Sequence, residues 1–231
     1  ALILDPTNSS PYADFLTGAT IPAGLLTLNN LADNGTVELT AAGAGVTVGM
    51  KDASGAADSL NLVTKVASAD LDFGTVSTNG VETVHITATD SAGAANKATL
   101  AVTDTGLTTV IVSGNANVDL TSAAATLSTV NASALTGNLT FSSNVNTVSI
   151  TGGSGADIIT ASGNKAVIHG GVGADTIAVS GDFAVVYGEA GKDIFDISNP
   201  TTSLNAYATI MDPTTGDLIK FDSGSVSFVP A

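Results

Sequence analysis

A nonapeptide repeat near the C-terminus constrains the fold of this chain more than any other feature. It reads GGSGADIIT at 152–160, GGVGADTIA at 170–178 and GEAGKDIFD at 188–196, so successive copies begin two nonapeptide lengths apart. The pattern is G-G-x-G-x-D-x-U-x, where U is a large apolar residue, and it is typical of parallel β-helices. Glycine permits positive φ and close approach of backbone carbonyls, while position eight points inward. The repeat therefore predicts a stack of short coils.

The inward position persists between the three motifs. It is Ile159, Ile177 and Phe195 in the motifs themselves, and Ile168 and Val186 in the two intervening nonapeptides. Two nonapeptides then make one coil, and equivalent residues of every second nonapeptide lie on neighbouring coils at a strand spacing of about 4.8 Å.

The same frame continues upstream of the motifs. Phe141 and Ile150 extend it backwards, and from residue 107 onward apolar positions recur roughly every nine to eleven residues. Short apolar or alternating runs between Gly, Asn, Asp and Ser clusters predict further strands. The expected strands are Leu25–Leu28, Thr36–Thr40, Gly45–Met50, Ser59–Val63, Leu71–Phe73, Thr83–Thr87, Ala98–Val102, Thr109–Val112, Val118–Leu120, Leu139–Phe141 and Val148–Ile150.

These patterns predict an all-β fold, a right-handed parallel β-solenoid (a β-helix or β-roll) with a short β cap at its C-terminal end. We expect a linker or peripheral strand (1–24), a β-rich solenoid-like segment (25–106), non-metal coils (107–151), calcium-binding coils (152–198) and a cap (199–231). A solenoid needs such a cap because its last strand otherwise has an open edge.

Composition agrees with stacked strands and excludes some partners. The chain has 231 residues, only 4% of them aromatic, and no cysteine, so disulfides and cysteine-based zinc sites are excluded. Its net charge of −15 disfavours nucleic acid as a partner. The opening ALILDPTNSS has no basic region and no initiator Met, and we expect the sequence to be the C-terminal part of a longer protein.

The aspartates at position six of the motifs indicate a metal site. Asp157, Asp175 and Asp193 occupy the same position in successive motifs and should form a ladder along one edge of the solenoid. Carboxylates about 5 Å apart repel each other by roughly 1 kcal/mol even in water. Calcium prefers hard, anionic oxygen ligands, so a divalent ion between coils would reverse that repulsion.

Motifs for catalysis are missing from the sequence. There is no HExxH zinc-protease motif and no GxSxG nucleophile elbow. The two histidines, His85 and His169, lie in separate strand-like runs, where a structural role is expected. We therefore expect no enzymatic activity in this chain.

The three nonapeptides resemble the repeats of RTX proteins, which Gram-negative bacteria export by type I secretion. Three upstream phrases, GVETVHITATD (80–90), VIVSGN (110–115) and VNASALTG (130–137), resemble segments that precede the repeats in bacterial surface-layer (S-layer) proteins. The resemblance covers roughly residues 25–222. It implies an uncleaved C-terminal secretion signal and a protein that folds outside the cell when calcium binds.

The resemblance also implies a ligand set of position-six Asp side chains and loop carbonyls. These positions are Asp157, Asp175 and Asp193 with Gly153, Gly155, Gly170, Gly171, Val172, Gly173, Gly188, Ala190 and Gly191. The third motif departs from the pattern because Glu189 replaces a glycine, so that turn is expected to be strained, with two well-formed sites and a weaker third. Asp212 and Asp217 are candidates for a terminal calcium site, and Asp52 and Asp58 flank a glycine in a stretch that is either a degenerate calcium turn or a solvated loop.

The resemblance implies a structural S-layer subunit whose calcium-dependent folding drives lattice assembly on the cell surface. Its expected partners are other copies of itself, the type I secretion apparatus, and lipopolysaccharide or another outer-membrane component. Two alternatives remain: a calcium-binding segment of a secreted RTX adhesin, and the noncatalytic C-terminal domain of a type I secreted enzyme.

Overall fold

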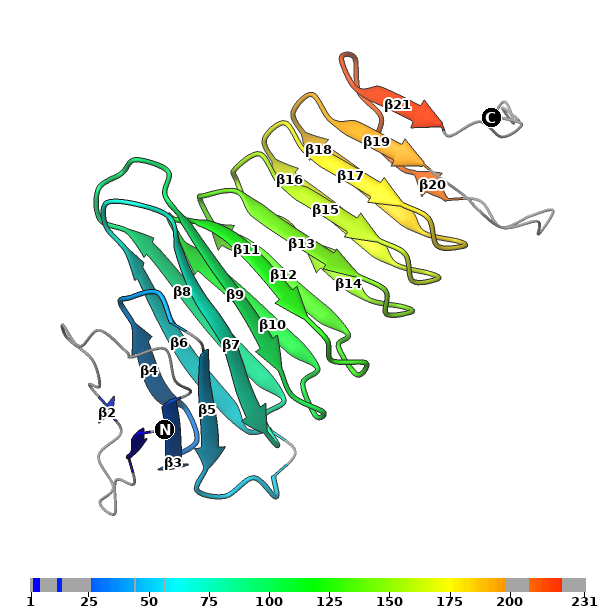
Figure 1. Ribbon diagram of the computed structural model, residues 1–231. Coiled ribbons are helices and arrows are strands. Elements are labelled where there is room, and N and C mark those ends of the chain that lie inside the picture. The colour runs from blue at the N-terminus through cyan, green and yellow to red at the C-terminus, as the bar shows by residue number, and fades with distance from the viewer. Residues whose placement is uncertain are drawn as a thin grey trace.

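The described part of the chain is a solenoid of parallel strands. A computed structural model describes residues 2–4, 12–13, 26–43, 45–55, 57–197 and 208–221. Within these ranges there are 21 strands and no helix, and therefore no helix that could cross a membrane. The odd-numbered strands form one sheet, here called sheet A, and the even-numbered strands form sheet B, so the chain changes sheet after every strand. Figure 1 shows the resulting coils stacked from the N-terminal to the C-terminal end. The predicted all-β parallel solenoid is confirmed.

The two sheets have 11 and 10 strands within the described ranges. Sheet A contains, in order, β1 Leu2–Leu4, β3 Leu26–Leu31, β5 Gly45–Met50, β7 Leu71–Asn79, β9 Lys97–Thr103, β11 Asn117–Ser122, β13 Leu139–Ser143, β15 Ile158–Ala161, β17 Thr176–Val179, β19 Ile194–Ile197 and β21 Leu218–Phe221. Sheet B contains β2 Tyr12–Ala13, β4 Gly35–Leu39, β6 Ser59–Val66, β8 Thr83–Asp90, β10 Thr109–Gly114, β12 Thr129–Leu135, β14 Ser149–Thr151, β16 Val167–Val172, β18 Val185–Ala190 and β20 Thr209–Ile210.

The core lies between the two sheets and follows the nonapeptide frame. In sheet A, Phe141 pairs with Ile159, Ile159 with Ile177, and Ile177 with Phe195, so each partner lies two nonapeptides further along the chain. All four side chains are at most 1% exposed. The strands alternate buried and half-buried residues, as expected when one face of each sheet packs inward. The inward positions predicted from the motifs, Ile168 in sheet B among them, are confirmed.

The coils outside the motif region are longer. Leu26 pairs with Val46, and Gly45 pairs with Thr75, so both coils contain more residues than two nonapeptides. Because the strand pairing is kept, the extra residues lie in the turns and in longer strands such as β7. The coil of two nonapeptides is therefore specific to the segment from β13 to β19.

The C-terminal strands continue the same stack. β20 pairs with β18, and β21 pairs with β19 in parallel, so residues 208–221 add one more coil to the solenoid. The rest of the predicted cap, 199–207 and 222–231, lies outside the described residues. At the other end, β1 pairs with β3 and β2 with β4, and the remainder of 1–24 is likewise not described.

Candidate metal centre

The three motifs lie at one edge of the solenoid, in the turns that lead from sheet B to sheet A. Each motif follows or overlaps the end of a sheet B strand, β14, β16 or β18, and its position-six Asp directly precedes the sheet A strand. The strand register therefore puts Asp157, Asp175 and Asp193 at the same place in successive coils, and each is only 1% exposed. The sequence-predicted ladder is present in the fold.

One carboxylate oxygen of each aspartate joins its coil to the preceding one. Asp157 Oδ1 accepts the backbone N–H of Leu139 at 2.6 Å. Asp175 Oδ1 accepts the N–H of Asp157 at 2.8 Å, and Asp193 Oδ1 accepts the N–H of Asp175 at 2.9 Å. Asp217 Oδ1 accepts the N–H of Asp193 at 2.9 Å and so continues the ladder into the last described coil.

The second carboxylate oxygen is not satisfied in two of the coils. Oδ2 of Asp157 accepts the N–H of Gly153 at 2.5 Å, whereas Oδ2 of Asp175 and of Asp193 are buried and have no hydrogen-bond partner among the described residues. A buried polar atom without a partner typically costs about 1–3 kcal/mol, and more when it is charged. These oxygens are therefore suited to a cation that no described side chain supplies.

The first glycine of each motif lets this oxygen and the backbone of the next coil approach closely. A Cβ on Gly170 would stand 2.5 Å from Asp175 Oδ2 and 2.8 Å from the Gly188 carbonyl oxygen. A Cβ on Gly152 would meet Asp157 Oδ2 and the Gly170 carbonyl at even shorter range. A carboxylate oxygen and a carbonyl oxygen of the next coil thus lie close together beside the glycine, and both are ligand types that calcium prefers.

Gly152 was not among the residues predicted to take part in the site. It is the first residue of its motif, in the same position as Gly170 and Gly188, and that alignment could have identified it. What the sequence does not show is that its missing side chain, rather than its own carbonyl, lets Asp157 Oδ2 and the Gly170 carbonyl approach each other.

The third motif differs from the first two. The atoms nearest to a Cβ on Gly188 would be Asp193 Oδ2 and, at 2.8 Å, the ring of Phe195 in place of a carbonyl of the next coil. Glu189 pairs in register with Gly171 and has a φ of 66°, in the left-handed region that side chains disfavour. This agrees with the strain expected from the sequence.

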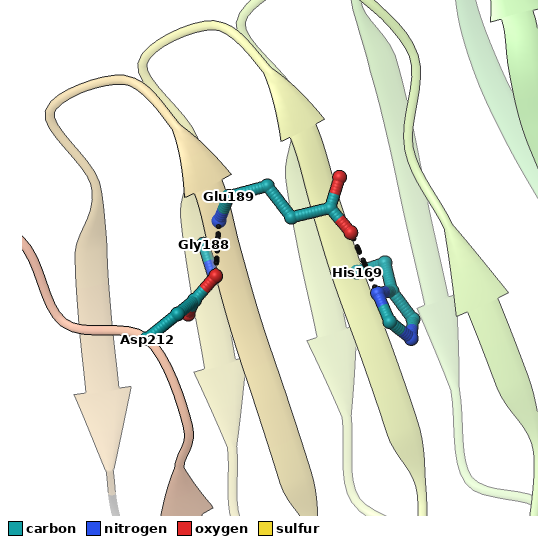
Figure 2. A network of polar contacts seen from close by, with 4 residues as sticks. All are labelled: His169, Gly188, Glu189 and Asp212. Carbon is teal, nitrogen blue, oxygen red and sulfur yellow. Dashed lines mark hydrogen bonds and ion pairs between the residues drawn. The ribbon is translucent and has the colours of Figure 1, made fainter.

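The loop of the third motif is held by the last described coil. Figure 2 shows that Asp212 accepts the N–H groups of Gly188 and Glu189, each at 2.9 Å. The Glu189 side chain extends to His169, where Oε1 lies 2.7 Å from Nδ1. Asp217 also accepts the N–H of Thr214 at 2.6 Å. Both aspartates predicted for a terminal calcium site are thus bonded to backbone donors.

The pKa values of the three motif aspartates are all raised. The pKa of Asp175 is raised to about 7, and burial is the largest cause. The N–H of Asp157 lowers this pKa, whereas the negative charges of Asp157, Asp193 and Glu189 raise it further. Burial likewise raises the pKa of Asp157 and of Asp193.

Asp217 shows the opposite direction. Burial acts to raise its pKa, but the N–H groups of Asp193 and Thr214 outweigh burial and hold the pKa below its usual value. A carboxylate that accepts several N–H groups is stable as an anion without metal.

Asp90, on the same edge further upstream, provides an internal contrast. It is 4% exposed, yet its carboxylate accepts the N–H groups of Ala92, Ala94 and Asn96 at 2.9–3.0 Å. Burial acts to raise its pKa, but these N–H groups, with that of Asn96 the strongest, lower it. Asp90 thus has backbone donors for both carboxylate oxygens, whereas Asp175 and Asp193 each keep one oxygen without a partner among the described residues.

The other predicted carbonyls take part in contacts between coils. The Gly153 carbonyl accepts the N–H of Val172 at 3.0 Å, and the Ala190 carbonyl accepts the N–H of Gly173 at 2.8 Å. The carbonyls of Gly155 and Gly173 lie against the glycines one coil further on, Gly173 and Gly191. The close approach of these backbones explains why glycine recurs at this position.

Asp52 and Asp58 lie in a different turn, on the edge that leads from sheet A to sheet B. Asp52 Oδ1 accepts the hydroxyl of Ser54 at 2.6 Å and its N–H at 3.1 Å, which lowers the Asp52 pKa. Asp58 keeps one buried oxygen without a partner among the described residues. The two carboxylates line an open groove and share no hydrogen bond there.

Side chains alone do not make a metal site in the described part of the chain. No three His, Cys, Asp or Glu side chains of the described ranges lie close enough together to hold an ion. Each motif contributes one carboxylate, so carbonyls have to supply the remaining ligands.

The chain matches no protein-family model, and no curated protein matches its sequence.

Proposed function

We propose that this chain is a calcium-dependent structural part of a secreted surface-layer protein, with no catalytic role. The observation that carries the proposal is the buried Oδ2 of Asp175, which has no hydrogen-bond partner among the described residues and lies with the Gly188 carbonyl beside Gly170. Two partly negative atoms at such a place destabilise the fold unless a cation lies between them.

Two places satisfy the requirements of calcium best. Asp175 with the Gly188 carbonyl would hold one ion, and Asp157, whose Oδ2 also accepts the N–H of Gly153, would hold a second with the Gly170 carbonyl. Bound Ca²⁺ supplies the positive charge that these oxygens lack, and its six to eight ligands leave room for further carbonyls and water. Asp193 would form a weaker third place, because Phe195 lies where the first two have a carbonyl.

The expected energy is enough to control folding. Extracellular calcium modules bind with Kd of about 10⁻⁴–10⁻³ M. At a tenfold excess over Kd each ion adds roughly 1.4 kcal/mol to the free energy of unfolding, so two ions add about 3 kcal/mol. The chain would remain loosely folded in the cytoplasm, where calcium is scarce, pass through a type I secretion apparatus, and fold on the outside.

Circular dichroism tests this coupling. The chain is prepared in EGTA and then titrated with CaCl₂, with MgCl₂ as the control because Mg²⁺ demands a tighter octahedral geometry. We expect strand signal and melting temperature to rise with calcium and much less with magnesium. Unchanged strand content and melting temperature in calcium would rule out the calcium-dependent fold.

Electron microscopy tests the assembly that the proposal assigns to the folded chain. Ordered two-dimensional sheets after calcium addition are expected for a surface-layer protein, with lipopolysaccharide vesicles as a candidate support. Folded particles that bind a cell surface and never form sheets would instead favour an adhesin.

A further inference from the structure

Two outward-facing rows of sheet B carry no charged side chain over six neighbouring strands. Its central row of register partners is His85, Ile111, Asn131, Thr151, His169 and Tyr187, on β8 to β18. The row beside it runs from Thr83 to Val185 and contains only Thr, Ser and Val. We call these two rows the neutral face. Both histidines of the chain lie on it, and its two rows contain no Asp, Glu or Lys.

Charged side chains lie at both ends of the neutral face and on strands β9 and β11 of sheet A. On the outer side of sheet A, Lys97 Nζ lies 3.4 Å from Asp119. On sheet B itself, the Lys65–Glu38 ion pair at 2.8 Å lies on β6 and β4, before the neutral face begins. At its other end Glu189 turns its carboxylate to His169 (Figure 2). None of the 21 acidic and 6 basic residues of the chain lies in the two rows themselves.

This distribution limits how two copies of the chain can meet. Each copy has a net charge of −15, so contacts through acidic turns bring like charges together. A contact through the neutral face avoids that repulsion over most of its area, with the Glu189 carboxylate at its C-terminal end. Its flat rows of in-register strands are also identical in both copies, which suits a two-fold contact in which the same surface meets itself.

We propose that the neutral face is the surface through which a second copy of this chain binds. This inference rests on the proposed lattice function and names the contact surface for it. A polysaccharide is disfavoured as the occupant because the two rows present one aromatic side chain, Tyr187, whose ring is stacked on His169 at 4.4 Å.

The size of the face predicts a weak contact. Six strands span about 24 Å across the sheet, and the two rows with their flanks cover about 13 Å along the strands. That area is below the roughly 800 Å² per partner of a standard stable interface. A single pair of chains should therefore associate weakly in solution, and a lattice would strengthen the contact by repeating it.

Sedimentation velocity of the calcium-loaded chain at rising concentration tests the proposal. The test variant is T109E/S149E, which places one negative charge on β10 and one on β14, two strands apart. The matched control is T121E/T160E, which makes the same change on the outer side of sheet A, on β11 and β15. We expect T109E/S149E to weaken self-association at least tenfold and T121E/T160E to change it less than threefold. Equal loss in both variants, or no loss in T109E/S149E, would overturn the proposal.

A second measurement does not depend on introduced charge. The chain has no cysteine, so Asn131→Cys on the neutral face and Ser142→Cys on sheet A each provide one defined thiol. A short bis-maleimide should link Asn131→Cys chains into dimers in calcium and should link Ser142→Cys chains little. The reverse result would assign the contact to sheet A.

The outcomes separate this inference from the proposed function. A wild-type chain that gains strand structure with calcium but stays monomeric at every concentration would overturn the neutral-face contact alone. Absence of any calcium response would overturn the proposed function. If T109E/S149E self-associates like the wild type and loses binding to lipopolysaccharide vesicles, the face binds polysaccharide and the proposal is wrong.

Discussion

At Asp175 the two oxygens of one carboxylate have different surroundings. Oδ1 accepts the N–H of Asp157, whereas buried Oδ2 has no partner among the described residues and lies with the Gly188 carbonyl close beside Gly170. An asparagine at this position would keep an oxygen that accepts the N–H of Asp157, and its amide N–H could donate to the Gly188 carbonyl. Replacing the Asp175 carboxylate by an amide would therefore put a hydrogen bond where the carboxylate needs a cation.

We therefore expect Asp175→Asn to raise the melting temperature without calcium and to reduce the increase that calcium produces. A gain of about 1 kcal/mol corresponds to about 2–4 °C for a chain of this size. Differential scanning calorimetry in EGTA and in calcium measures both effects. Asp90→Asn is the control, because its carboxylate already accepts N–H groups, and it should destabilise the chain equally in both conditions. An Asp175→Asn variant with an unchanged calcium response would exclude Asp175 from the site.

The raised pKa of Asp175 predicts an unusual dependence of stability on pH. Its pKa is about 7 in the metal-free fold and near 3.8 when unperturbed, so the folded chain holds the proton more tightly than the unfolded chain. The contribution of Asp175 to the free energy of unfolding is therefore complete below pH 4 and is lost as the pH rises through 7. The free energy changes by at most about 1.4 kcal/mol per pH unit. Metal-depleted protein should melt at a higher temperature at pH 5 than at pH 8.

Calcium should reverse that slope, because it competes with the proton for the same carboxylates. Melting curves at pH 5, 6, 7 and 8, with and without calcium, measure the two slopes. A metal-free melting temperature that increases from pH 5 to pH 8 would contradict the assignment, and Asp175→Asn should flatten the dependence.

Among the elements, the turns from sheet B to sheet A are packed so closely that they exclude even a methyl group. We expect Gly170→Ala to destabilise the chain by about 3 kcal/mol and to abolish its calcium response, since the new Cβ would collide with Asp175 Oδ2 and the Gly188 carbonyl. Gly49→Ala is the matched control, because its nearest neighbour is the movable Asn29 side chain at 3.3 Å. Urea unfolding in calcium measures both. Similar losses in the two variants would show that the motif turn has no special packing.

The strands show what sequence periodicity could and could not predict. The inward positions from Phe141 to Phe195 were predictable because an apolar residue recurs at one fixed spacing. Strand β12, Thr129–Leu135, was not among the expected strands, because Asn131, Ser133 and two alanines interrupt its apolar pattern. Neighbouring strands on both sides pair with it and complete the sheet.

The candidate site was predictable in its aspartates and less so in its details. The motif identifies Asp157, Asp175 and Asp193, but the free oxygen of Asp175 depends on which backbone N–H groups the next coil brings near. The bonds from Asp212 and Asp217 to the third loop likewise come from a coil that breaks the nonapeptide frame. Contacts of that kind depend on the fold and leave no local pattern.

For the whole molecule, stacking in one dimension makes stability local. Each coil contacts chiefly its neighbours, so loss of calcium at the motif edge should loosen the coils from β14 to β21 and leave β6 to β12 protected. Hydrogen exchange followed by mass spectrometry, in EGTA and in calcium, measures this along the chain. Magnesium in place of calcium is the control. A uniform loss of protection in EGTA would show that the solenoid unfolds as one unit.

The coil of two nonapeptides also sets a constant increment in the length of the solenoid. Residues 170–187 contain one complete turn through both sheets, so a second copy inserted after residue 187 would lengthen the molecule by about 4.8 Å and add one Asp to the ladder. Insertion of a single nonapeptide would instead carry the following motif to the opposite edge. The solenoid can therefore be lengthened by whole coils while the register and the outward-facing positions of both sheets are kept.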